Sequence, residues 1–125
     1  MKKFYVCNLC GNLFGVVEDS GVIPMCCGDD MVELEANTSD GASEKHVPVL
    51  ERTGKTLKVK VGSVSHPMES AHYIQWIIAT QGNRTQRYVL KAGDDPEAEF
   101  ILDGESGSVT VYAYCNLHGL WSAES

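Results

Sequence analysis

A loop near the C-terminus carries a cysteine and a histidine that could bind a metal. The residues from Val109 to Cys115 alternate in character, which predicts a strand that presents every second side chain on one face. Cys115 lies at the predicted end of this strand, and His118 follows three residues later, just before a glycine that allows a turn. One loop therefore offers a soft thiolate and an imidazole together. The face expected to include this thiolate consists of Val109, Val111, Ala113 and Cys115.

The other four cysteines lie near the N-terminus. Cys7 and Cys10 form a Cys-x-x-Cys-Gly knuckle, a turn whose backbone N–H groups can point at the sulfurs, and Cys26 and Cys27 are adjacent. Four thiolates suit iron or zinc, and the cysteine pattern does not decide between the two metals. The adjacent pair differs from the commoner arrangement of two knuckles and would strain a tetrahedron. A zinc ribbon that only folds this segment is the structural alternative.

The four histidines are all in the second part of the chain, next to turn or strand-end signals: His46, His66, His72 and His118. Any one of them alone is more often a surface or core residue than a ligand. Together with Cys115 they are the soft or borderline donors that remain once a four-cysteine site is filled. Four imidazoles and a thiolate are too many for tetrahedral zinc, but they suit a square-pyramidal iron with an axial thiolate and an open sixth position. A thiolate opposite that position pushes electron density onto the iron and so favours inner-sphere reduction of an oxygen species.

The elements that must position these residues are predicted to be short strands. With 125 residues and 43% apolar content, the chain can bury one modest core, plus a small module that something besides packing holds together. The polar stretch from Glu35 to Ser43 predicts a linker, and hence domains of residues 1–36 and 37–125. Several short strands favour an all-β sandwich, and one helical turn is possible from Pro67 to Ala71. The strands are predicted at Lys55 to Gly62, Tyr73 to Thr80, Thr85 to Leu90, Glu99 to Leu102 and Val109 to Cys115.

Charge and cysteine usage limit the partners and the compartment. A formal net charge of −7 disfavours nucleic acids and anionic membranes as partners, so an anionic substrate needs a local positive group. An odd number of cysteines, two of them adjacent, favours metal binding in a reducing compartment over disulfides. No apolar run approaches the roughly 20 residues that span a bilayer, and no signal-peptide core follows Met1. The expected location is the cytoplasm.

These motifs together resemble the desulfoferrodoxins, the two-iron form of superoxide reductase. The resemblance covers nearly the whole chain. It rests on Cys7-x-x-Cys10, Cys26-Cys27, Glu44-Lys45-His46-Val47-Pro48, Gly62-Ser63-Val64-Ser65-His66-Pro67-Met68-Glu69, His72-Tyr73-Ile74-Gln75-Trp76, Pro96-Glu97-Ala98-Glu99 and Tyr114-Cys115-Asn116-Leu117-His118-Gly119.

The resemblance implies two iron sites. A desulforedoxin-like domain of residues 1–36 would hold one iron, and an immunoglobulin-like β-sandwich of residues 37–125 would hold the reactive one. The implied ligands are Cys7, Cys10, Cys26 and Cys27 for the first iron, and His46, His66, His72, His118 and Cys115 for the second. The resemblance also implies a homodimer and a rubredoxin-like electron donor.

Two further residues gain a role from the resemblance. It implies that Glu44 can occupy the sixth position of the ferric iron and that Lys45 supplies positive charge to an incoming anion. Without the resemblance, Glu44 and Lys45 would be interpreted as a solvated surface pair, as adjacent opposite charges usually are. Leu120, where close relatives often have a second histidine, departs from the commonest pattern but is not a ligand position.

The expected function is one-electron reduction of superoxide to hydrogen peroxide in defence against oxidative stress, without release of oxygen. Three alternatives remain: an electron carrier with two iron sites and no substrate, a zinc-stabilised binding module with incidental histidines, and a dismutase, which would release oxygen. The four-cysteine site could hold zinc instead of iron. It could relay electrons or mainly hold the small domain and the dimer together.

Overall fold

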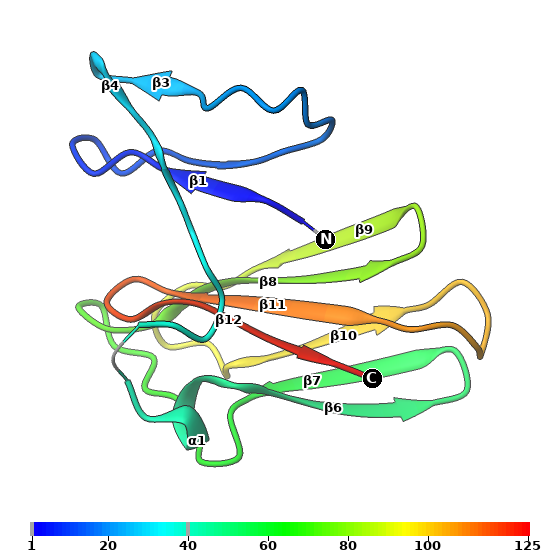
Figure 1. Cartoon of the computed structure of the whole chain (residues 1–125). Helices are drawn as coiled ribbons and strands as arrows, with labels where there is room; N and C mark the ends of the chain where they lie inside the picture. Colours follow the sequence, from blue (N-terminus) through cyan, green and yellow to red (C-terminus); the bar gives the residue numbers. More distant parts are fainter. Residues whose placement is uncertain (1, 40) are drawn as a thin grey trace. The chain divides into compact units, whose positions relative to one another are not determined.

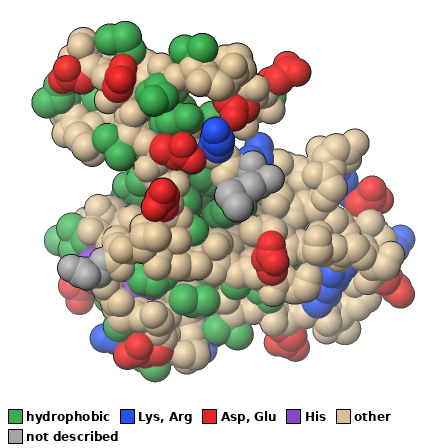
Figure 2. Space-filling model, in the orientation of Figure 1, with side chains coloured by type: hydrophobic (Ala, Val, Ile, Leu, Met, Phe, Trp, Pro, Cys, Tyr) green, Lys and Arg blue, Asp and Glu red, His purple; other side chains and the backbone are tan. Residues whose placement is uncertain are grey.

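The computed structural model describes residues 2–39 and 41–125, and these are mainly β (Figure 1). They form twelve strands and one helix of four residues, α1 (Ser43–His46). The chain divides into two compact units, Met1–Glu35 and Ala36–Ser125. Among the described residues, no helix is long and apolar enough to cross a membrane. Acidic side chains are spread over the face drawn in Figure 2, in keeping with the net charge of −7.

The first unit consists of very short strands joined by turns. β1 (Phe4–Val6) pairs antiparallel with both β2 (Leu13–Gly15) and β5 (Val32–Glu33), and β3 (Met25–Cys26) pairs with β4 (Asp29–Asp30). Its buried cluster consists of Tyr5, Cys7 and Met31, with Val16 and Cys26 packed against it, and Phe4 is also buried. So small a cluster gives the unit little stability through packing alone.

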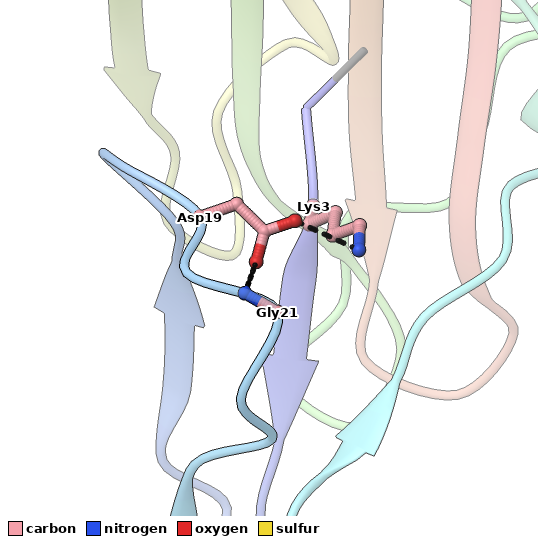
Figure 3. Close-up of polar contacts among 3 residues, drawn as sticks. All are labelled: Lys3, Asp19 and Gly21. Carbon is pink, nitrogen blue, oxygen red and sulfur yellow. Dashed lines mark hydrogen bonds and ion pairs between the residues drawn. The ribbon is translucent and has the colours of Figure 1, made fainter.

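An ion pair supports the start of β1. The Lys3 ammonium lies 2.9 Å from the Asp19 carboxylate, which also accepts a hydrogen bond from the Gly21 N–H at 2.8 Å (Figure 3). Hydrogen bonding to Lys3 and then to Gly21 lowers the pKa of Asp19. Both side chains are more than a third exposed, so the pair adds little to stability, and its main effect is to fix the turn at Asp19 to Gly21.

The second unit is a sandwich of two antiparallel sheets. Its strands are β6 (Pro48–Thr53), β7 (Thr56–Val61), β8 (Ile74–Gln81), β9 (Arg84–Val89), β10 (Glu97–Ile101), β11 (Thr110–Cys115) and β12 (Gly119–Glu124). One sheet has the order β10-β7-β6 and the other has the order β12-β11-β8-β9. The fold-class prediction, a small four-cysteine unit followed by an immunoglobulin-like antiparallel sandwich, is confirmed.

The core of the sandwich follows the alternation of the sequence. Leu57, Val59 and Val61 of β7 are buried, while Lys58 and Lys60 between them are exposed. The face predicted for β11 is buried throughout: Val109, Val111, Ala113 and Cys115 have no exposed surface. Because successive side chains of a strand point to opposite faces, each sheet buries one face against the other.

The strand directions gather the histidines and Cys115 at one end of the sandwich. α1 with His46 leads into β6, and β7 ends at Val61, shortly before His66. In the other sheet, His72 precedes β8, and β11 ends at Cys115. Since neighbouring strands are antiparallel, the start of one strand lies beside the end of the next.

Two local predictions differ from the structure. The five strands predicted in the second half are present, but the strands β6 and β12 were not predicted. The segment from Pro67 to Ala71 is not helical, because Glu69 and His72 form an antiparallel bridge that closes a turn there. The only helix among the described residues lies instead at Ser43–His46, which begins at the last residue of the predicted linker.

The core assignment can be tested with Leu57→Ala. We expect a loss of about 2–5 kcal/mol in the free energy of unfolding of the sandwich, because the truncation leaves a cavity in a fully buried position. Urea unfolding followed by tryptophan fluorescence measures this directly, since both tryptophans, Trp76 and Trp121, belong to the second unit. The control is Lys58→Ala, the exposed neighbour, which should change stability by no more than about 0.5 kcal/mol. Equal losses in the two variants would contradict the assignment.

Candidate metal centres

Two turns of the first unit bring the four N-terminal cysteines together. The Gly11 N–H donates to the Cys7 carbonyl at 2.9 Å and so closes the turn that carries Cys7 and Cys10. The second turn joins β3 to β4, and Cys27 within it has a φ of 54°, a left-handed conformation that is uncommon outside glycine. The four sulfur atoms all lie within 4.8 Å of one another.

The spacing of the sulfurs fits a tetrahedral metal. The Cys10 and Cys26 sulfurs are 3.6 Å apart, and those of Cys26 and Cys27 are 3.9 Å apart. Thiolates bound at about 2.3 Å in a tetrahedron lie about 3.8 Å from one another. The N–H of Cys10 points at the Cys7 sulfur and that of Asn12 at the Cys10 sulfur, each at 3.5 Å. These donors would stabilise negative charge on the sulfurs.

The thiols of this cluster cannot all ionise easily by themselves. Hydrogen bonds from the N–H groups of Cys10 and Leu9 lower the pKa of Cys7 to about 6. Contact with the sulfurs of Cys10, Cys7 and Cys26 raises the pKa of Cys27 to about 12. Four adjacent thiolates need a cation between them, so the donor set fits a bound metal and does not distinguish iron from zinc.

The second cluster lies at the end of the sandwich where the strand termini meet. One donor atom from each of His46, His66, His72 and Cys115 lies within 4.8 Å of the others. His118 adjoins them, because its Nδ1 is 3.1 Å from the His46 Nε2 and 3.9 Å from the Cys115 sulfur. All five residues predicted for the second site are thus brought to one place.

Two of the imidazoles face each other in a way that fits a cation between them. The Nδ1 of His46 is 2.8 Å from the Ala42 carbonyl, and the Nδ1 of His66 is 2.6 Å from the Pro67 carbonyl. Carbonyls only accept hydrogen bonds, so each Nδ1 carries the proton and each neutral ring has a bare Nε2. These two Nε2 atoms are 3.1 Å apart, with lone pairs directed at the same region. Two ligands at right angles, each about 2.1 Å from a metal, lie about 3 Å apart.

Burial keeps these histidines neutral. Loss of solvation lowers the pKa of His66 to about 4 and also lowers the pKa values of His46 and His72. Neutral imidazole is the form that binds metals. The Nε2 of His72 is buried without a hydrogen-bond partner, which is costly for a polar atom. A role of His72 as a metal ligand would explain this arrangement.

The sulfur of Cys115 is fully buried on the inner face of the sandwich. Burial raises the pKa of this thiol, and hydrogen bonds from the backbone N–H groups of Leu117 and His118 oppose the increase. The sulfur therefore lies in a dry setting with donors that can stabilise a thiolate. A positive ion beside it would complete its ionisation.

Glu44 and Lys45 lie on α1, directly before His46, and their side chains are exposed. The charge of Lys45 contributes, after desolvation and neighbouring imidazoles, to the lowered pKa values of His46 and His72, which places Lys45 at the edge of the cluster. Within the described residues, no hydrogen bond or ion pair joins the Glu44 carboxylate to the histidines.

The turn that carries these two residues is anchored through its backbone. The Glu44 carbonyl accepts hydrogen bonds from the Val64 N–H at 2.8 Å and the Ser63 hydroxyl at 3.2 Å. Gly62 lies so close that a Cβ there would be 2.6 Å from this carbonyl, so only glycine fits without a shift of the backbone. The main chain of the turn is thus fixed while the two charged side chains reach solvent.

Trp121 supports the second cluster and was not identified from the sequence. Its ring, 3% exposed, stacks on His46 with a centroid distance of 4.8 Å, and its Nε1 donates to the His118 carbonyl at 3.1 Å. The hydroxyl of Ser39 donates to the same carbonyl. Nothing in the sequence distinguishes a tryptophan with this role from an ordinary core aromatic.

The chain is similar in sequence to proteins of a known family. The family model for desulfoferrodoxin matches residues 38–124. A desulfoferrodoxin of Syntrophotalea carbinolica is 50% identical over 122 residues, which cover 98% of this chain and 95% of the relative. A desulfoferrodoxin of Nitratidesulfovibrio vulgaris is 46% identical over 123 residues, 98% of this chain and 96% of the relative.

The fold agrees with these relationships. The crystal structure of the superoxide reductase from Treponema pallidum superposes with a TM-score of 0.79 at 35% identity and covers 98% of both chains. The similarity to solved and curated proteins therefore extends through both units, including the segment before residue 38 that the family model does not match. On this combined similarity of sequence and fold, the chain belongs to the desulfoferrodoxin family.

Proposed function

We propose that the protein is a superoxide reductase, which reduces superoxide to hydrogen peroxide at an iron bound by His46, His66, His72, His118 and Cys115. The observation that carries the proposal is the convergence of two bare imidazole nitrogens 3.1 Å apart with a buried sulfur in the same cluster. The names of its relatives and of the matched crystal structure support the same activity.

The residues of the cluster have different roles in this reaction. An iron held there would supply one electron to superoxide, and two protons from solvent complete hydrogen peroxide. Imidazole binds a metal as a neutral ligand, so the Cys115 thiolate would provide the anionic charge of the ligand set. The buried setting of this sulfur, with two N–H groups directed at it, lets the protein adjust how much charge it donates.

Lys45 is proposed to attract the substrate. The protein carries a net charge of −7, which repels an anion at long range, and Lys45 is an exposed cation at the edge of the cluster. Glu44, on the same turn, is proposed to bind the open position of the oxidised iron, as the family resemblance implies. Because its backbone is fixed and its side chain is exposed, the carboxylate can move toward the cluster without a change in the main chain.

We further propose that the four-cysteine site binds iron, with zinc as the alternative, and that its first role is to hold a desulforedoxin-like domain, residues 1–36, together. The small buried cluster of this unit supports the assignment. The remainder, residues 37–125, is the proposed catalytic domain. The family resemblance supports a rubredoxin-type electron donor and a homodimer.

A dismutase is the second candidate, because iron can also oxidise superoxide. Both activities remove superoxide, but they differ in their products and in their need for a reductant. A dismutase releases oxygen together with hydrogen peroxide. A reductase consumes an external electron donor and releases no oxygen.

The thiolate can be tested with Cys115→Ser in the iron-loaded protein. The parent should show a thiolate-to-iron absorption band on mild oxidation, and should remove superoxide with formation of peroxide and no oxygen. The variant should lose this band and more than about 100-fold in rate, because a direct ligand is worth at least as much as its supporting shell. The control is Cys10→Ser, which should keep the band. Evolution of oxygen by the parent would favour the dismutase, and a colourless parent with one zinc per chain would favour a binding module.

The role of Lys45 can be tested with Lys45→Ala. At low salt the bimolecular rate with superoxide should fall by about tenfold, and its dependence on ionic strength should flatten, since a local field is screened by salt. Lys58→Ala removes the same charge from the outer face of β7 and serves as the control. If the two variants show the same rate and salt slope, Lys45 has no special role in attracting the substrate.

The structural role of the four-cysteine metal can be tested with Cys10→Ser. We expect one metal ion per chain to be lost, and amide hydrogen exchange in residues 4–33 to become fast, because this unit has little buried surface. Urea unfolding of the sandwich should stay unchanged. Protection that persists in the metal-depleted first unit would show that packing alone is sufficient to fold it.

A further inference from the structure

The ligand histidines are not held in the same way. The His46 and His66 rings are fixed by backbone carbonyls at 2.8 and 2.6 Å, each bonded to the nitrogen that does not face the cluster. Such outer contacts orient metal-binding imidazoles. Among residues 2–39 and 41–125, the His72 ring has no comparable partner, and its Nε2 is buried and unpaired. The ring packs against His66 and His118, at centroid distances of 4.7 and 5.0 Å, and with no hydrogen bond to a carbonyl its position depends on these contacts and on its backbone.

Asn116 holds the backbone on both sides of His72. Its Oδ1 accepts the Tyr73 N–H at 2.9 Å, and its Nδ2 donates to the Ala71 carbonyl at 3.1 Å. Its own backbone N–H donates to the Tyr73 carbonyl at 3.2 Å. One residue thus bonds to the neighbours that flank His72 in sequence. The amide fits in one orientation only, because a flipped side chain would oppose donor to donor and acceptor to acceptor.

The turn before His72 is closed independently. The N–H of Glu69 donates to the His72 carbonyl at 2.9 Å, and the N–H of His72 donates to the Glu69 carbonyl at 3.0 Å. This bridge fixes the curvature of the turn but does not connect it to β11, which carries Cys115. Within the described residues, Asn116 is the only one whose side chain forms hydrogen bonds to the backbone of residues 71 and 73.

We propose that Asn116 is a positioning residue that ties the His72 turn to the loop of Cys115 and His118, and so sets His72 in place as a metal ligand. Asn116 directly follows Cys115 in sequence, so the same short segment supplies the thiolate and orients an imidazole from another loop. A shift of this segment moves both ligands together. The inference rests on the proposed metal centre, but it concerns how one ligand is held and not the reaction that follows.

The test is the iron affinity of the histidine and cysteine site, measured anaerobically by competition with a ferrous chelator. Occupancy is followed after oxidation by the absorption band that Cys115→Ser abolishes, so iron at the four cysteines does not enter the result. Asn116→Ala should weaken iron binding by about 10- to 100-fold, the usual effect of removing a supporting contact. An unchanged affinity, within about twofold, would overturn the proposal.

The matched control is Gln81→Ala. Gln81 also bridges two backbone groups with its amide, the Asp103 N–H at 2.7 Å and the Ser106 carbonyl at 3.2 Å, at the far end of β8. Its removal costs the same kind of contact away from the cluster. Iron affinity in this variant should match that of the parent, and a comparable loss would show that the effect of Asn116→Ala is one of general stability.

A double-mutant cycle with His72→Ala tests whether Asn116 affects iron affinity through His72. If Asn116 acts through His72, adding Asn116→Ala to His72→Ala should change iron affinity by less than about twofold. An equal loss with and without His72 would overturn the proposal. If His72→Ala alone left iron affinity unchanged, the proposed metal centre itself would fail.

A second variant helps to separate the loss of the Asn116 hydrogen bonds from misfolding. Asn116→Asp keeps the acceptor for the Tyr73 N–H but sets an oxygen against the Ala71 carbonyl, so it should also weaken iron binding and can replace Asn116→Ala in the cycle. Tryptophan fluorescence and circular dichroism report whether the sandwich is intact. If neither variant folds while Gln81→Ala does, Asn116 is a residue of the fold and the assignment to His72 is overturned.

Discussion

The second cluster depends on the close approach of two acceptor nitrogens. The Nε2 atoms of His46 and His66 are 3.1 Å apart, and because each Nδ1 carries the proton that a carbonyl accepts, the Nε2 atoms of the neutral rings are bare. Without a cation, this arrangement places two lone pairs against each other in a buried site. The surrounding contacts, including the Trp121 ring stacked on His46, keep the rings in place against that repulsion. The structure is therefore preorganised for a metal.

This preorganisation follows from the topology of the sandwich. Antiparallel pairing puts the start of β6 and β8 at the same end as the close of β7 and β11, so loops far apart in sequence meet there. The rigid sheets fix the ends of these loops, and the hydrogen bonds of the loops fix the rings. Donor atoms drawn from four segments are then held close together with little freedom.

The two units reach stability by different means. The sandwich buries a contiguous apolar core, including Leu57, Ile77 and Val111, and can fold by packing. The first unit has a buried cluster of three residues, one of which is Cys7, a proposed metal ligand. Its fold and its metal site are thus built from the same side chains. In the sandwich, Cys115 also belongs to the core, but it is one of many buried residues.

The sequence by itself determined the donor types, the alternation that buries Cys115, and the resemblance that links Glu44 and Lys45 to the cluster. These were predictable because ligand chemistry and strand periodicity are local properties of the chain. The helix at Ser43–His46, the bridge between Glu69 and His72, and the supporting role of Trp121 were decided only by the tertiary structure. The bridge competes with a helical turn that local propensity allows, and Trp121 gains its role through contacts with residues distant in sequence. Such contacts depend on how strands pair, and no short stretch of sequence contains that information.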